Sequence, residues 1–91
     1  MPLDIEEAKK KAHDFIVNSY GYKQILSWDV PNIEKADNEW RLDIRFIFMM
    51  RIRYKSGLGH GRVEKGHRLT LDAKTGEIIK HIMIYENRTV R

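Results

Sequence analysis

The stretch from Trp40 to Tyr54, WRLDIRFIFMMRIRY, constrains the fold of this chain more than any other. Every even-numbered position in it is apolar or aromatic, whereas the odd-numbered positions are mostly charged. A strict period of two predicts a β-strand with one buried face. At about 3.3 Å per residue, a straight strand of this length would span about 50 Å.

The length of the chain, 91 residues, predicts a single domain over residues 1–91. A globular chain of this size has a radius of gyration of roughly 12 Å, so a straight strand would overshoot it. We therefore expect the strand to coil or bend around a helix. The predicted fold class is α+β, with one N-terminal helix packed on a curved four-stranded antiparallel meander, in the order α-β-β-β-β.

The predicted helix runs from Ile5 to Tyr20. Asp4 is a good N-cap, and Glu7 three residues later completes the spacing of a capping box. Gly21 is placed to end the helix in a left-handed conformation. One helical face carries apolar and small residues that we expect to pack on the sheet: Ile5, Ala8, Ala12, Phe15, Ile16 and Ser19.

The predicted strands are residues 22–33, 40–54, 62–71 and 77–85, with a frayed tail over 87–91. Hairpin turns are expected at 35–39 and at 72–77, where DAKTGE indicates a type I turn followed by a left-handed Gly76. The glycine-rich residues 55–61 predict a flexible connection. Pro31 indicates an edge strand or a bend, and Gly66 indicates a bulge. The last strand is apolar on both faces, which is typical of a central strand or an oligomer contact.

Two segments, DIEEAKKKAHDFI and LTLDAKTGEII, resemble the opening helix and the closing hairpin of PepSY-type domains. The resemblance implies a helix gripped by a curled antiparallel sheet, as in cystatin-like folds. It also implies a non-enzymatic module, since PepSY-type domains are associated with exported peptidases and suspected of regulating them. No catalytic residues carry over from this family.

Composition excludes some classes of site and partner. Cysteine is absent, so the chain can form neither disulfides nor thiolate metal sites. A single glutamine and abundant charge of both signs favour a thermophilic source. The start of the chain is charged, and no apolar run has the length of a signal peptide or a membrane span. We expect a cytoplasmic protein that does not bind membranes.

No residue pattern predicts catalysis, a cofactor or a metal site. The four histidines, His13, His60, His67 and His81, lack the i, i+4 spacing of zinc-binding helices. If the last turn pairs Asp72 with Glu77, His67 and His81 point to opposite faces of the sheet. Residues 56–61 lie near cations that could hold a phosphate, but they lack the ending of a P-loop, and a loose hairpin is the favoured interpretation.

The outward face of the long strand is the candidate functional surface. Residues 41–68 contain eight Lys/Arg against Asp43 and Glu64, a net charge of +6. The favoured interpretation is a self-association patch of Ile47, Met49, Ile79 and Met83 in a homodimer. The alternative is a nucleic-acid or anion surface, and its candidate residues are Arg41, Arg45, Arg51, Arg53 and Arg62. A solvated face with cross-strand ion pairs would carry neither function.

These patterns together predict a small, non-catalytic intracellular module of PepSY-like type. We expect it to bind a protein or peptide partner, or itself, through the outer face of the sheet. Nucleic-acid binding through the arginine stripe is the alternative.

Overall fold

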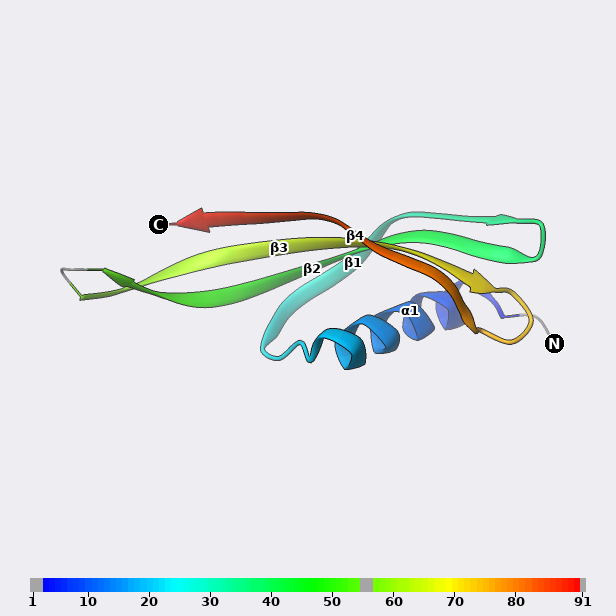
Figure 1. Cartoon of the computed structure of the whole chain (residues 1–91), viewed down its shortest axis with the longest axis horizontal. Coiled ribbons are helices and arrows are strands. Elements are labelled where there is room, and N and C mark those ends of the chain that lie inside the picture. Colours follow the sequence, from blue (N-terminus) through cyan, green and yellow to red (C-terminus); the bar gives the residue numbers. More distant parts are fainter. Residues whose placement is uncertain (1–2, 55–56, 91) are drawn as a thin grey trace.

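The computed structural model describes residues 3–54 and 57–90, and only the backbone of residues 50–54, 58, 60 and 90. One helix is followed by four antiparallel strands in a single sheet (Figure 1). The elements are α1 (Ile5–Tyr20), β1 (Ile25–Ala36), β2 (Glu39–Tyr54), β3 (Gly57–Asp72) and β4 (Ile78–Val90). The predicted fold class, a helix and then a four-stranded meander, is confirmed.

Both predicted helix caps are present. The carboxylate of Asp4 accepts a hydrogen bond from the Glu7 amide at 2.8 Å, and the Glu7 carboxylate accepts one from the Asp4 amide at 3.3 Å. At the other end Gly21 has a φ of 64° and its amide donates to the carbonyl of Val17. These bonds satisfy main-chain groups that the helix leaves without internal partners.

The two hairpin turns also form where the sequence predicts them. Asp37 and Asn38 have φ values of 50° and 64°, the left-handed conformation of a two-residue turn between β1 and β2. In the second turn the Asp72 carboxylate accepts hydrogen bonds from the amides of Lys74 and Thr75. Gly76 then has a φ of 77°, as predicted.

The hydrophobic core lies between α1 and one face of β2 and β3, which we call the inner face. Ala12 and Ile16 of the helix pack there, and the small Ala8 and Ala12 let the helix approach the sheet closely. The sheet contributes alternate residues, as the period of two predicts: Leu42, Ile44, Phe46, Leu69 and Leu71. Each of these is at most 2% exposed.

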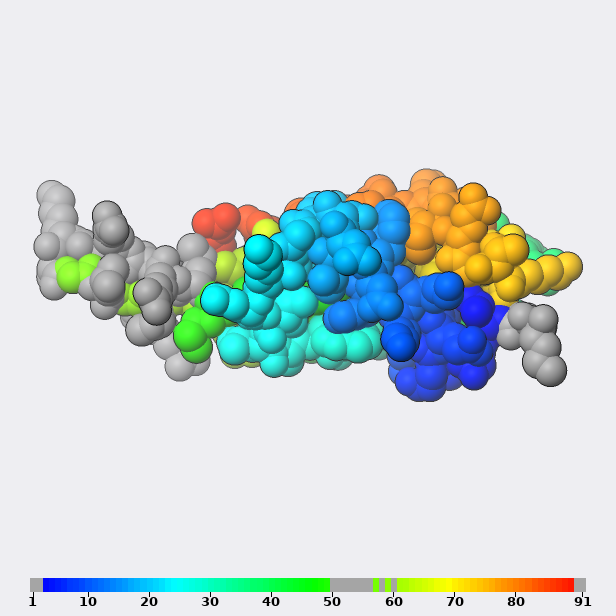
Figure 2. All heavy atoms as spheres, turned by 90° about the horizontal axis from the view of Figure 1, so that it is seen from below, coloured from blue at the N-terminus to red at the C-terminus, as the bar shows by residue number. Residues whose placement is uncertain are grey.

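The molecule is longer than the predicted globule. It measures 56 × 18 × 18 Å, and its radius of gyration is 15.4 Å. β2 pairs with β3 along its whole length, from Glu39–Asp72 to Tyr54–Gly57, so it continues past the helix and does not coil around it. A helix of 16 residues is about 24 Å long. The helix therefore covers only part of the inner face (Figures 1 and 2).

Two predicted boundaries were wrong for the same reason. β3 begins at Gly57, so most of the predicted glycine-rich loop is strand, and residues 55 and 56 lie outside the described residues. The predicted tail belongs to β4 as far as Val90, which pairs with Gly61. In both places pairing with a long neighbouring strand overrides the local sequence signal.

The order and register of the strands test three further predictions. The order β1-β2-β3-β4 places β1 and β4 at the edges. Pro31 therefore lies in an edge strand, as predicted, and the pairing of β1 is irregular between Asp29 and Asn32. β4 is not the central strand that its apolar residues allowed. The predicted irregularity at Gly66 is confirmed, since the β3–β4 register shifts between Gly66 and His67.

Candidate functional site

The outer face of the sheet, opposite the helix, carries ion pairs between neighbouring strands. Arg45 of β2 donates to both carboxylate oxygens of Asp29 on β1, at 2.8 and 2.6 Å, and lies 3.7 Å from Glu64 on β3. Arg68 of β3 donates to both oxygens of Asp43, at 2.8 and 3.3 Å. The Arg68 hydrogen bond lowers the pKa of Asp43. Much of the positive charge predicted for this face is therefore neutralised locally.

Of the predicted nucleic-acid contacts whose side chains the structure describes, two are already paired with carboxylates. Arg45 is paired as described above, and Arg41 lies 3.6 Å from Glu39. Arg62 is exposed. Arg51 and Arg53 lie in β2, but their side chains are outside the described part of the chain. The geometry favours a solvated, ion-paired face over a nucleic-acid surface.

The four residues predicted to form a self-association patch do not all lie together: Ile47 and Met49 are neighbours on one face of β2, but Ile79 and Met83 lie away from them on β4. Ile47 is only 9% exposed, whereas Met49 is 52% exposed. Ile79 lies near the opposite end of the sheet, beside the Thr70–Lys80 pair. Met83 stands opposite His67, in a row that faces the helix. The register therefore does not bring these residues together into one continuous patch.

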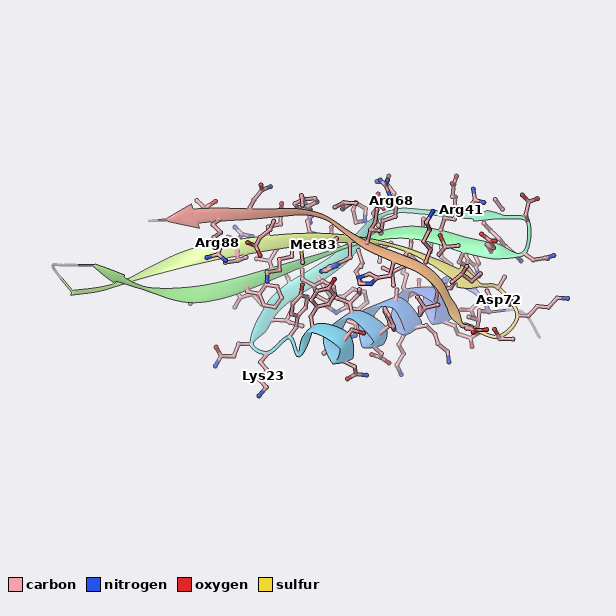
Figure 3. The ribbon with its side chains drawn as sticks, viewed as in Figure 1. Lys23, Arg41, Arg68, Asp72, Met83 and Arg88 are labelled. Carbon is pink, nitrogen blue, oxygen red and sulfur yellow. The ribbon has the colours of Figure 1, made fainter. Side chains whose placement is uncertain are left out.

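The apolar residues of β4 instead gather along an edge of the sheet. Ile79, Ile82 and Met83 are 54%, 47% and 41% exposed. Ile79 and Ile82 also line a shallow depression of about 500 Å³ on the outer face, together with Arg41 and Arg68. Figure 3 shows both arginines on the side of the sheet away from α1. Among the described residues, β4 exposes three large apolar side chains, whereas the other edge strand, β1, exposes Leu26 and Trp28.

The inner face holds a cluster of aromatic and histidine side chains near the end of α1. His67 is completely buried, and its Nε2 lies 2.7 Å from the Tyr22 hydroxyl. His81 Nε2 lies 3.2 Å from the Tyr20 hydroxyl. The rings of His67 and His81 are stacked, with centroids 5.7 Å apart.

This cluster corrects the prediction that His67 and His81 face opposite sides. Leu71 pairs with Ile78 as predicted, but Thr70 then pairs with Lys80, so Ile79 is an extra residue in β4. The shift by one residue places His81 opposite Leu69 and not opposite Arg68. A one-residue shift moves a side chain to the other face, which is why sequence reasoning missed this cluster. The two adjacent isoleucines at 78 and 79 were the only sequence signal.

Burial sets the protonation of the cluster. Burial, and then the neighbouring His81 and Lys65, lower the pKa of His67 to about 4. Its Nδ1 has no hydrogen-bond partner among the described residues. Burial also raises the pKa of Tyr22 to about 12. Both groups are therefore neutral near pH 7, and they form a partly buried hydrogen-bonded pair.

In residues 3–54 and 57–90, no three His, Asp or Glu side chains are close enough together to hold a metal ion. Within the same residues, no helix combines the length and the apolar character needed to cross a membrane. Comparison of the chain with protein-family models, curated proteins and solved structures finds no match in any of the three.

Proposed function

We propose that this chain is a small, non-catalytic binding module of PepSY-like type that associates with a second copy through the edge of β4. The observation that carries the proposal is the exposed apolar edge of that strand. The order of one helix and four meandering strands agrees with the fold that the PepSY resemblance implies.

The two edges of the sheet differ in how they discourage pairing. β1 contains Pro31, which cannot donate to a neighbouring strand, and it has two irregularities in its pairing. Residues 78–85 of β4 contain no proline, and Lys80 is their only Lys, Arg, Asp or Glu. Natural edge strands are usually protected by charge, proline or bulges. β4 has bulges at its two register shifts, but the stretch from Lys80 to Met83 between them is regular.

A second copy is the partner that needs the fewest additional assumptions. Antiparallel pairing of one strand with its own copy closes a two-fold dimer, because both copies use the same surface. Pairing along Lys80–Met83 would satisfy main-chain groups at the edge. It would also bring the exposed side chains of Ile79, Ile82 and Met83 against the partner. An extended strand from a different protein would use the same groups.

Sedimentation tests the proposal with a matched pair of variants. The parent is expected to sediment as a dimer, and Ile82→Lys/Met83→Lys, which places charge on both sides of the edge, as a monomer. Met49→Glu changes an exposed apolar residue of the outer face away from this edge, so it should remain a dimer. A parent that is monomeric at every concentration would overturn self-association. Loss of the dimer only in Met49→Glu would place the interface on the outer face.

Nucleic-acid binding is the alternative. It is disfavoured because Arg41, Arg45 and Arg68 are each paired with a carboxylate. A cation that already faces a carboxylate gains less from a phosphate, because the carboxylate must first be displaced.

A further inference from the structure

The inner face of the sheet is hollowed at the point where α1 ends. This cavity is wide open to solvent and has a volume of about 250 Å³. Gly21, Tyr22 and Lys23 line it from the link after the helix, and the sheet contributes Phe48, Val63, Lys65 and Arg88. Figure 3 shows Lys23 and Arg88 at this same end of α1, with the Lys23 side chain extending away from the sheet.

The floor of the cavity is apolar. Val63 is 6% exposed, and Phe48 is partly buried. The rings of Tyr22 and Phe48 meet edge to face, with centroids 4.7 Å apart. Pockets for drug-sized ligands usually measure about 300–1,000 Å³. A cavity just below this range, with a floor of rings, fits a ligand with a single aromatic ring.

The rim of the cavity is cationic. The Lys65 ammonium lies 5.2 Å from the centre of the Tyr22 ring and 3.2 Å from Glu86. Arg88 Nη2 also lies 3.2 Å from Glu86. Lys65 and Arg88 share the single carboxylate of Glu86, which holds both cations in place and leaves one net positive charge. The contacts of Arg88 with Glu86 use Nε and Nη2. The Nη1 donors have no hydrogen-bond partner among the described residues.

The dipole of α1 favours one orientation of an anionic ligand in the cavity. The carboxyl end of a helix carries partial negative charge, and α1 ends at this cavity. A negative group is therefore disfavoured beside Gly21 and favoured beside Arg88. The ring of the same ligand would then lie against Phe48 and Val63.

We infer that this cavity binds a small aromatic carboxylate, with the carboxylate on Arg88 and Lys65 and the ring on Phe48 and Val63. The inference is independent of the proposed function, because it uses neither the edge of β4 at Ile79–Met83 nor a second copy. It assigns a ligand class to a surface that the helix leaves uncovered.

Titration of the ¹⁵N-labelled full chain with 3-phenylpropionate tests this inference. The amides of Gly21, Val63 and Arg88 should shift, with a dissociation constant on the order of 1 mM, as expected for so small a ligand. The neutral 3-phenylpropionamide has the same ring and should bind about tenfold more weakly. Added salt should weaken only the acid, because it screens the ion pair.

Three variants locate the site. Arg88→Gln and Lys65→Met should each weaken binding of the acid about tenfold, and Lys65→Met keeps an unbranched side chain of similar length. Lys74→Met removes an exposed cation from the turn before β4, outside both the cavity and the β4 edge, so it should bind like the parent. Equal binding of acid and amide, shifts centred elsewhere, or unchanged affinity in Arg88→Gln would each overturn the inference. So would the absence of any shift at about ten times the expected dissociation constant.

Discussion

The Tyr22 hydroxyl lies 2.7 Å from Nε2 of His67, and this hydrogen bond ties the link after α1 to the middle of β3. His67 is completely buried, and the Tyr20, Phe46 and His81 rings lie around it. The bond therefore helps to fix the end of the helix on the sheet.

Acid should destabilise the protein through His67. The pKa of His67 is about 4 in the folded chain and 6.5 when the side chain is fully solvated, as in the unfolded chain. Between these two pH values the unfolded chain therefore binds more protons than the folded chain. Stability is fully present above pH 6.5 and is lost as the pH falls towards 4. The difference corresponds to about 3 kcal/mol. Urea unfolding of the parent between pH 7 and pH 4 measures this slope.

A His67→Phe variant provides the control for that slope. It keeps an aromatic ring in the core but cannot be protonated, so its stability should fall much less between pH 6.5 and 4. Among the described residues, Lys65 on its own strand and His81 on β4 are the titratable neighbours that lower the pKa of His67. An equally steep slope in His67→Phe would assign the effect to other groups.

Gly66 should not tolerate a side chain. A Cβ built at this position would overlap the ring of Tyr85, which lies over the glycine. Overpacking of this kind typically costs about 1–3 kcal/mol, so Gly66→Ala should lower the free energy of unfolding by that amount. Denaturant unfolding of Gly66→Ala, Tyr85→Ala and the double variant forms a cycle. If alanine at 66 costs as much without the Tyr85 ring, the contact is not the cause.

The N-cap of α1 should contribute measurably to stability. Asp4→Ala removes the carboxylate that accepts from the Glu7 amide and should cost about 1 kcal/mol. Asp4→Asn keeps an acceptor oxygen and should lose much less. Thermal unfolding by circular dichroism compares the two, and equal losses would indicate that charge, not the hydrogen bond, matters at this position.

The arginines of the outer face should contribute little to nucleic-acid binding. Arg45 and Arg68 each make two hydrogen bonds to a carboxylate. Binding of duplex and single-stranded oligonucleotides at about 0.15 M salt is expected to be no tighter than non-specific association. A tight complex that weakens steeply with salt and is lost in Arg45→Ala would reverse this conclusion.

Much of the fold could be predicted because local chemistry determined it. Asp4 caps the helix through its carboxylate, and Gly21 and Gly76 adopt left-handed conformations that the absence of a side chain allows. The alternation around Phe46 correctly identifies the inner face. The residues of the core follow from a period of two, which survives in any sheet register that keeps the hairpins in place.

The candidate site depends on the register and packing of the strands, for which the sequence carries only a weak signal. The extra residue Ile79 in β4 decides that His81 meets His67, and the adjacent isoleucines at 78 and 79 are the only local sign of this bulge. The paired state of Arg45 depends on Asp29, in a strand whose pairing is irregular. The cavity beside Arg88 exists because the helix is shorter than the sheet, which is a tertiary property.

At the end of the molecule where both hairpin turns lie, the start of the chain is bonded to them. The Leu3 amide donates to the carbonyl of Ala73, the Trp40 indole donates to Leu3, and the Ala73 amide donates to Asn38. These bonds join early, middle and late positions of the polypeptide, so contacts of high sequence separation close this end. A ribosome must therefore complete most of the chain before the first helix can be anchored, and the emerging segments before that moment are the ones that a chaperone would meet.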